Sequence, residues 1–558
     1  IHLYFSYLYT NVLNIYFFFN LQKYYRNFKS MIESYKRKID FQDNYDAIVI
    51  GSGMGSMTTA ALLSKEGKKV LVLERHYVAG GFTHVFKRKG YEWDVGIHYI
   101  GEVQNLNSPI RKMFDYVSDK NLKWEDMGDV YDRIIIGNKI YDFVKGVENF
   151  KKRLISYFPD ESSAIENYIQ MVFDCNKAMK KFYIEKALPS FISSLFGYFF
   201  RKKYLKYSSK TTYEVISSLT QNQELIKVLT AQYGDYGLPP KQSSFAMHAS
   251  VVKHYFKGGS FPIGGSSEIV NTINPVIEKS KGKVVVKAEV KEIIIENDRA
   301  IGVLMEDGKK FFSKIIISGV GVFNTYDKLI SNELSIKYGF KNNLKAVKPS
   351  VAHGCLYIGL NGSAKELSLP KHNLWIYPVK TDHDSSVKNY LDNQDAEFPL
   401  VYISFPSAKD PSWDSRYPGK STIDVITLLP YESFAKWEGT SWKKRGESYD
   451  ILKESISKRL LEQLFIQLPH LRDCVDQYEL SSPLTTKNFV NYNKGELYGL
   501  DHTPARFSQK FLRPKTPIKG LYLTGQDIVS AGVGGALFSG LITATAITGI
   551  NFMKKIYK

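Results

Sequence analysis

The 558-residue sequence has little cysteine and fewer acidic than basic residues. Cys175, Cys355 and Cys474 lie far apart, so the sequence has no disulfide framework and no CxxC metal site. Lysine and arginine total 75 against 56 acidic residues, which gives a formal net charge of +19. Such an excess is typical of proteins that bind nucleic acid, anionic membranes or acidic ligands. No nucleic-acid-binding motif is present and the lysines are dispersed, so two explanations remain: attraction to a membrane surface, or a compositional bias without function.

The overall amino-acid composition is that of an ordinary globular protein. Hydrophobic residues account for 44% and charged residues for 23% of the sequence, which excludes a disordered or fibrous protein. The chain is long enough to form two or more domains with large cores.

A dinucleotide-binding pattern begins near residue 45. Ala47–Ile50 is predicted to be a buried strand, Gly51 allows a tight turn, and Gly53 leaves room for a pyrophosphate before a helix N-terminus. A second apolar run ends at Glu74, where a carboxylate can accept hydrogen bonds from ribose hydroxyls. Ser56 stands at the third position of GxGxxG, where a glycine would give the closest contact between helix and strand.

Two further segments extend this pattern. The pair Gly80–Gly81 lets a loop pass close over the cofactor, and a plain NAD dehydrogenase has no need of such a loop. Residues 520–527 (GLYLTGQD) are predicted to run from a strand into a turn, before an apolar helix at about 534–550. Asp527 in this turn could bond a sugar hydroxyl. The sequence therefore favours one extended cofactor held by both ends of the chain, FAD rather than NAD.

Two segments could contact a membrane. Residues 1–20 are apolar and aromatic but include asparagines, and residues 1–30 are either a membrane anchor or sequence absent from the real product. Residues 187–207 (ALPSFISSLFGYFFRKKYLKY) end in a basic cluster and fit an interfacial segment that meets phosphate head groups. The alternative for 187–207 is a buried helix of a second domain.

Several blocks resemble one family. The segment ending in GIHYIGE (45–102), HYFKGGSFPIGGSSEI (254–269) and GLYLTGQDIVSAGVGGAL (520–537) are similar to the all-trans-retinol 13,14-reductases, or retinol saturases. This family is related to carotenoid isomerases and phytoene desaturases in the flavin amine-oxidase-like superfamily. The resemblance covers about residues 45–551.

The resemblance implies an α/β fold in which a Rossmann-like FAD-binding domain and an α+β substrate domain are discontinuous in sequence. The expected FAD-binding segments are 45–110, 258–330 and 515–551. The substrate and membrane-contact segments are 111–257 and 331–514, and 1–44 is an N-terminal extension or anchor.

The resemblance also implies the cofactor contacts. FAD is expected, with NAD or NADP as the alternative redox partner. The expected pyrophosphate contacts are Gly51, Ser52, Gly53, Met54, Gly55 and Ser56; the other cofactor-binding residues are Glu74, Arg75, Gly80, Gly81, Val290, Gly525 and Asp527. Because Ser56 replaces the family's usual glycine, close helix packing at this position is in doubt.

The expected reaction is saturation, desaturation or isomerisation of a C=C bond in an apolar retinoid or carotenoid, with saturation of the 13,14 bond of all-trans-retinol preferred. The resemblance implies a membrane-associated enzyme, in the endoplasmic reticulum if the source is eukaryotic. His98 is the predicted catalytic residue, with His248 and His254 as alternatives, although a lone histidine is more often structural. Two rival hypotheses are amine oxidation and a flavin- or lipid-binding protein without turnover. No metal site and no oligomeric state are indicated.

Overall fold

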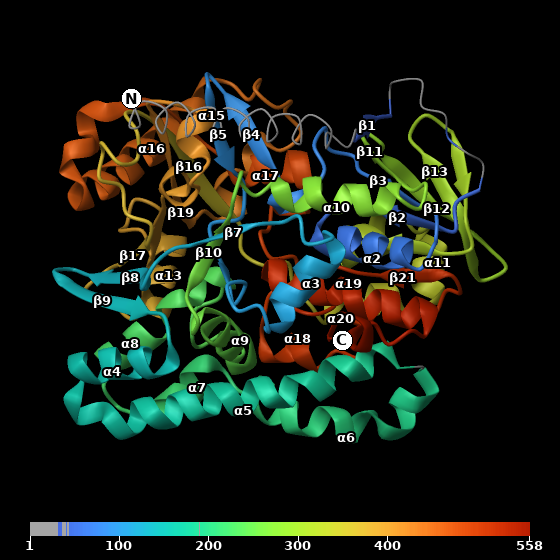
Figure 1. Ribbon diagram of the computed structural model, residues 1–558, viewed down its shortest axis with the longest axis horizontal. Coiled ribbons are helices and arrows are strands. Elements are labelled where there is room, and N and C mark those ends of the chain that lie inside the picture. Colours follow the sequence, from blue (N-terminus) through green and yellow to red (C-terminus); the bar gives the residue numbers. More distant parts are fainter. Residues whose placement is uncertain (1–31, 36–40, 42–43, 189, 558) are drawn as a thin grey trace, which may run out of the picture.

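The computed structural model describes residues 32–35, 41, 44–188 and 190–557. One half of the molecule is built on a six-stranded, wholly parallel sheet (Figure 1). Its fully buried strands have continuous apolar sequences such as AIVI and VLVL, as expected for a parallel sheet covered on both faces. In spatial order the strands are β1 (Glu33–Ser34), β11 (Lys283–Val286), β3 (Val70–Leu73), β2 (Ala47–Ile50), β15 (Ile316–Ser318) and β21 (Leu521–Leu523).

Segments far apart in sequence therefore meet in this sheet. Its strands come from all three segments expected to bind the cofactor, and β1 adds an edge strand from within the 1–44 extension. The division of the chain into domains stays a prediction.

Helix α2 (Met54–Lys65) is buried along nearly its whole length between α10 (Glu268–Glu278) and α19 (Gly532–Thr548). A glycine makes the crossing with α19 close, because a Cβ on Gly540 would lie 2.5 Å from the Cβ of Thr58. Helices α3 (Pro109–Val117) and α20 (Phe552–Tyr557) pack beside them.

Smaller sheets flank the parallel one. They are the antiparallel meander β12 (Val290–Glu296), β13 (Arg299–Met305) and β14 (Lys310–Phe312); the hairpin β4 (Val85–Arg88) and β5 (Tyr91–Asp94); and the set β6 (Ile100–Gly101), β10 (Gly259–Pro262) and β7 (Trp124–Asp126).

The other half contains a seven-stranded sheet in which only β17 and β8 pair in parallel. In spatial order its strands are β20 (Val475–Leu480), β16 (His353–Asn361), β19 (Lys420–Leu428), β18 (Val401–Ser404), β17 (Asn373–Tyr377), β8 (Val130–Ile136) and β9 (Lys139–Val144). Apolar side chains on one face pack against α13 (His383–Asp392) and α16 (Glu447–Gln467).

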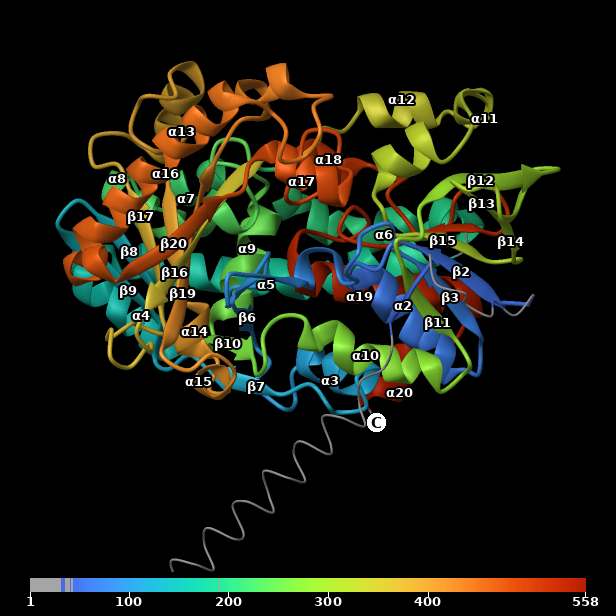
Figure 2. The same ribbon diagram turned by 90° about the horizontal axis from the view of Figure 1, so that it is seen from above.

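A layer of helices crosses the base of the molecule in Figure 1 and lies on the far side in Figure 2. It consists of α4 (Val147–Tyr157), α5 (Ser162–Ala187), α6 (Ser190–Ser208), α7 (Thr212–Ser217), α8 (Gln223–Leu229) and α9 (Phe245–Tyr255). The remaining helices are α11 (Asn332–Lys337), α12 (Phe340–Lys345), α14 (Pro406–Lys409), α15 (Trp413–Arg416), α17 (Pro483–Val490) and α18 (Pro504–Ser508).

The two segments singled out for membrane contact have different outcomes. Residues 1–20 lie outside the described residues. Residues 190–208 form α6, and the side chains of Leu195, Phe196, Tyr198 and Phe199 on it are exposed. The alternative of a buried helix is therefore wrong for the face that carries these side chains. Among the helices that the structure describes, none combines the length and apolarity that a membrane crossing requires.

Candidate cofactor cradle and active site

The turn after β2 leaves open space where a pyrophosphate is expected. Gly51 has a φ of 88°, which glycine adopts without strain, and its N–H donates to Leu73 O at 2.8 Å. A Cβ on Gly53 would meet no atom of the described chain within 4 Å. Gly53 is also the N-cap of α2 and supplies no side-chain cap, so the first N–H groups of the helix face this space unpaired by a cap.

Both ends of the chain meet at this turn. A Cβ on Gly55 would lie 2.7 Å from both N and Cα of Gly525, so the two turns touch through backbone alone. Gly525 has a φ of 101°, and its N–H donates to Ser539 Oγ at 2.9 Å. The cradle therefore combines the start of α2 with the turn before α19.

Glu74 closes the far side of the turn from the end of β3. Its Oε2 accepts hydrogen bonds from Ser52 N (2.9 Å) and Ser52 Oγ (2.7 Å), and its Oε1 accepts from His76 N (2.8 Å). A carboxylate offers about four acceptor positions. One therefore remains for a ligand hydroxyl, as the ribose prediction requires.

The second glycine pair passes directly over the first turn. Gly80 N donates to Ser52 Oγ at 2.8 Å, and a Cβ on Gly81 would lie 3.1 Å from Gly53 Cα. Both glycines have positive φ angles, 122° and 56°. The loop thus lies directly against the open space at Gly53.

Ser56 fits because another glycine makes room for it. The side chain is buried, and a Cβ on Gly319 would lie 1.9 Å from Ser56 Oγ. The glycine missing from α2 is thus matched by a glycine after β15. The hydroxyl of Ser56 has no hydrogen-bond partner among the described residues.

Other predicted cofactor residues have side chains that hold the protein together. Asp527 accepts from Val322 N (2.8 Å) and Leu500 N (3.2 Å), so its carboxylate fixes loops around the turn. Arg75 pairs with Glu289 at 3.1 Å and donates to the carbonyl of Asn488 at 3.0 Å.

Val290 and Met54 are placed by their strand and helix. Val290 begins β12 and is buried, two residues after Ala288, whose N–H donates to Glu74 O at 2.8 Å. Met54 is the first residue of α2 and is buried.

Two buried basic residues beside the turn at residues 525–528 were not predicted from the sequence. Arg506 donates to Gln526 O at 2.8 Å and to Asp527 O at 3.2 Å. Lys186 donates to Leu512 O at 2.5 Å and Ile528 O at 2.9 Å, and burial lowers its pKa to about 7. Since the partners are backbone carbonyls, no motif signals these contacts.

A row of polar side chains crosses one face of the seven-stranded sheet. Tyr357 pairs with Asp424, and Asp424 with Ser404, in the register of β16, β19 and β18. Asn373 pairs with Asp132 on β17 and β8. On the opposite face of the same strands, Leu356, Ile403, Ile423 and Val425 belong to a hydrophobic core cluster.

Residues 94–101, the GIHY segment, lie against this polar row. Lys409 Nζ donates to His98 O (2.9 Å), to Ser404 Oγ (2.7 Å) and to Asn373 Oδ1 (2.5 Å). Tyr99 donates its hydroxyl to Asp132 at 2.9 Å. These contacts fix the backbone on both sides of the His98 imidazole.

His98 and Asp424 form a buried dyad. Nδ1 of His98 lies 3.4 Å from Oδ2 of Asp424, and neither this nitrogen nor either Asp424 oxygen has a hydrogen-bond partner in the described part of the chain. Burial, with a smaller contribution from the nearby Lys409 cation, lowers the pKa of His98 to about 3. Burial raises the pKa of Asp424 well above its usual range, although Lys409 opposes this. Both shifts favour a neutral imidazole beside a protonated carboxyl group at neutral pH.

The two alternative histidines have structural partners. His248 lies between the hydroxyls of Tyr168 (2.8 Å) and Tyr236 (3.2 Å). Nε2 of His254 accepts from Gly101 N at 2.8 Å. Of the three candidates, His98 has the ring nitrogen whose only close partner is a titratable acid.

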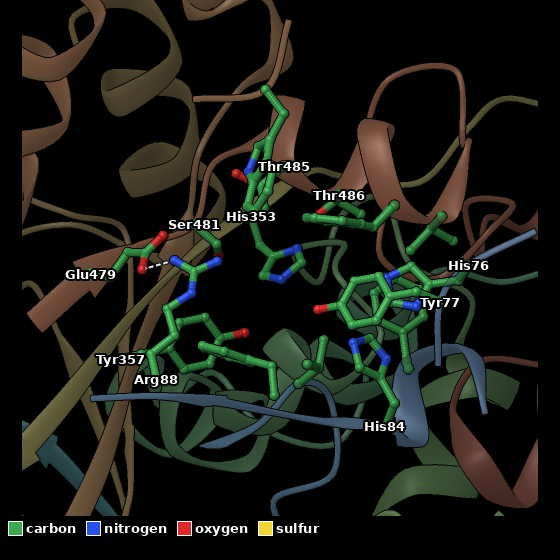
Figure 3. Close-up of a pocket in the computed structure, with 16 residues that line it drawn as sticks. His76, Tyr77, His84, Arg88, His353, Tyr357, Glu479, Ser481, Thr485 and Thr486 are labelled. Atoms are coloured by element: carbon green, nitrogen blue, oxygen red, sulfur yellow. Dashed lines mark hydrogen bonds and ion pairs between the residues drawn. The ribbon is translucent and has the colours of Figure 1, made fainter. Parts of the chain in front are cut away.

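A pocket of about 690 Å³, counted with its open mouth, lies between the loop after β3 and the seven-stranded sheet. In Figure 3, His353 projects into it between the Arg88–Glu479 ion pair and the His76–Tyr77 side. Burial lowers the pKa of His353 to about 4, and His98 nearby adds to this. The apolar and aromatic lining residues are Phe82, Phe86, Val95, Trp442, Phe489 and Val490.

Comparison with known proteins identifies the relatives of this chain. Residues 49–117 match the NAD(P)-binding Rossmann-like domain. An all-trans-retinol 13,14-reductase of Danio rerio is 36% identical, covering 91% of this chain and 87% of that protein. An inactive all-trans-retinol 13,14-reductase, also of Danio rerio, is 33% identical and covers 90% and 86%. A prolycopene isomerase of an Oncidium hybrid cultivar is 26% identical and covers 93% and 86%.

Solved structures share the fold. An oxidoreductase from Methanosarcina mazei superposes with a TM-score of 0.58 at 18% identity, covering 88% of this chain and 98% of that one. Cyclohexylamine oxidase from Brevibacterium oxydans gives 0.56 at 14% identity, covering 90% and 98%. The expected Rossmann-like, amine-oxidase-like fold and the resemblance drawn from the motifs are confirmed. The chain belongs to the all-trans-retinol 13,14-reductase family.

Proposed function

We propose that this protein is an FAD-dependent oxidoreductase that acts on a C=C bond of an apolar polyene. Saturation of the 13,14 bond of all-trans-retinol is the first candidate reaction, because four relatives that are 34–36% identical carry that activity in their names. The observation that carries the proposal is the open space at Gly53, enclosed by Gly81 and adjoining the Gly55–Gly525 contact. A cofactor that spans both turns must be longer than a mononucleotide.

The residues present fit FAD. The uncapped start of α2 and the side-chain-free approach at Gly53 suit a pyrophosphate, and Glu74 retains an acceptor position for a ribose hydroxyl. When bound, the cofactor would supply the hydride chemistry. The chain would bind it, orient it and exclude water.

Saturation of a C=C bond adds a hydride to one carbon and a proton to its neighbour. The His98–Asp424 dyad is the proposed source of that proton. A protonated Asp424 would donate to Nδ1 of His98 once their 3.4 Å separation shortens, and the imidazole would then keep its hydrogen on Nε2. Transfer from Nε2 to carbon, with refilling from Asp424, leaves aspartate behind, and solvent restores the proton.

The pocket beside His353 is the proposed substrate site. Aromatic side chains form much of its wall, as an apolar substrate would require. Ser481, Thr485 and the Arg88–Glu479 pair at one side could bind a polar end group of the substrate.

Polyene isomerisation is the second candidate, because a prolycopene isomerase is among the relatives. A protein without turnover is a third, since one relative is named inactive. Isomerisation changes no mass, and a protein without turnover changes neither the substrate nor the cofactor. An amine oxidase would instead oxidise an amine and leave polyenes unchanged.

The cofactor assignment is tested by purification of the full chain. We expect a yellow preparation that absorbs near about 450 nm and is bleached by dithionite, and release of FAD on denaturation. NADH and NADPH are then compared as reductants of the bound flavin. A colourless preparation that binds NADH but never FAD would contradict the proposal.

A further inference from the structure

Helix α6 exposes the densest group of large apolar side chains in the described residues. Leu195 is 70% exposed, Phe196 53%, Tyr198 60% and Phe199 72%. Ile184, at the adjoining end of α5, is 54% exposed. Large apolar side chains scattered singly are normal on a surface, but four within five residues form a continuous patch.

Basic side chains continue the same face of the helix. Lys202 and Lys206 follow Leu195 and Phe199 at helical spacing, and Lys203 lies beside them; all three are exposed. No ion pair of these three lysines occurs among the described residues; Lys202 lies over the Tyr198 ring and Lys206 over the Tyr207 ring. Residues 190–208 contain no aspartate or glutamate. The face thus has an apolar N-terminal part and an uncompensated cationic C-terminal part.

The patch is held rigidly to the rest of the protein. The α5–α6 corner is joined to the segment around the cofactor turn by Arg513, which donates to Ser193 Oγ (3.0 Å) and to Leu188 O (2.9 Å). Tyr183 donates to Val529 O at 3.1 Å. A contact made by α6 therefore positions the body of the molecule, including the α19 side of the cradle.

We propose that this face of α6 lies on an anionic lipid bilayer, with Leu195, Phe196, Tyr198 and Phe199 among the acyl chains and glycerol groups and the lysines at the phosphates. Aromatic and aliphatic side chains beside unpaired lysines are the combination that interfacial helices use. A groove on a protein partner would have to supply carboxylates in register with the lysines, whereas a lipid surface presents negative charge everywhere. The net charge of +19 acts in the same direction.

The test is vesicle flotation of the full chain with phosphatidylcholine vesicles that contain or lack phosphatidylserine. The apolar variant is Phe196→Ser with Phe199→Ser, and the basic variant is Lys202→Glu, Lys203→Glu and Lys206→Glu. The matched control is Ile451→Ser with Ile466→Ser, since these side chains on α16 are 62% and 65% exposed. We expect both α6 variants to float less than the control. In the basic variant, the loss should be confined to phosphatidylserine vesicles and should exceed about fivefold, the contribution of a single lysine.

A second measurement is independent of any other membrane contact. An environment-sensitive dye is attached to Phe199→Cys, or to Ile466→Cys as the control, with Cys474→Ser in both. We expect a blue shift with phosphatidylserine vesicles at position 199 alone. The proposal is overturned if the dye at 199 does not shift while the protein floats, or if the α6 variants float as the control does. Neither result bears on flavin content, so the test is independent of the proposed reaction.

Discussion

The proposed cofactor cradle and the proposed catalytic face of the seven-stranded sheet would work in opposite ways. The cradle works through missing side chains: Gly53 leaves space, and Gly55 lets the backbone of Gly525 approach. The sheet face works through side chains that are present, above all the dyad of His98 and Asp424. Adding atoms should therefore damage the first region, and removing or neutralising groups should damage the second.

The largest effect is expected from adding a side chain to the cradle. Gly53 has a φ of −61°, and its Cβ would meet no described protein atom, so Gly53→Val should fold but fill the pyrophosphate space. We expect the ratio of flavin to protein to fall by at least about tenfold, while circular dichroism and the melting temperature of the apoprotein stay unchanged. Gly53→Ala should lose less flavin than Gly53→Val. A Gly53→Val protein with full flavin content would place the cofactor elsewhere.

The second-largest effect is expected on the polar face of the seven-stranded sheet, with a substitution on its apolar face as the control. Asp424→Asn removes the proton but keeps the shape, so kcat should fall by about 10²-fold, with flavin content and KM nearly unchanged. The control is Leu356→Ala on the apolar face, which should cost about 2–5 kcal/mol of stability and leave kcat per folded molecule unchanged. Combining Asp424→Asn with His98→Gln should add little, since the two act as a unit. An unchanged kcat in Asp424→Asn would remove the dyad from the reaction.

A third test asks whether the cradle tolerates Ser56 only because residue 319 is glycine. Gly319→Ala places a methyl group where Ser56 Oγ lies, and overpacking of this kind costs about 1–3 kcal/mol. Ser56→Gly should restore most of that loss in the double variant. The measurement is the free energy of unfolding in urea for all four proteins. Additive effects would show that the two residues do not compensate each other.

The smallest effect concerns acid stability. Burial lowers the pKa of His248 to about 3, from 6.5. As the pH falls, His248 of the unfolded chain binds a proton before His248 of the folded protein does. The contribution of this histidine to the free energy of unfolding is therefore full above pH 6.5 and is lost as the pH falls towards the folded pKa. Between pH 6.5 and 4.5 the loss is about 2 kcal/mol for one histidine.

We expect the loss to begin beside the seven-stranded sheet and α9, where burial lowers the pKa of His98, His248, His353 and His383. Burial also lowers the pKa of His84 and His502, which lie beside the cofactor segments. Hydrogen exchange should therefore increase in β16 and α9 before β2 and β3. His248→Gln should have a shallower dependence of stability on pH. Earlier exchange in the parallel sheet would contradict this order.

The cradle could be predicted because its signal is local. The strand Ala47–Ile50, the turn and Glu74 lie within thirty residues, and each has a sequence requirement of its own. The bounds of the terminal helix were predicted to within a few residues, since the expected range of about 534–550 compares with Gly532–Thr548 in the structure. The compensation between Ser56 and Gly319 could not be read, since no local rule links residues so far apart.

The polar face of the seven-stranded sheet could not be predicted, because its residues are far apart in sequence and only strand pairing brings them together. Asp424 is one acid among many until the pairing of β16, β19 and β18 aligns it with Tyr357 and Ser404. His98 was singled out by its glycine turn, but its partner depends on sheet register. Lys186 and Arg506 bond to carbonyls, which every residue has, so sequence gives no signal for them.

A single-turnover experiment tests the central claim most directly. The purified flavoprotein is reduced with dithionite without oxygen, freed of excess reductant and mixed with all-trans-retinol. We expect the absorbance of oxidised flavin to return as each retinol gains two hydrogens, one as a hydride and one as a proton. The amount of flavin reoxidised should equal the amount of retinol reduced. Flavin that stays reduced while retinol and carotenoids keep their mass and geometry would contradict the account.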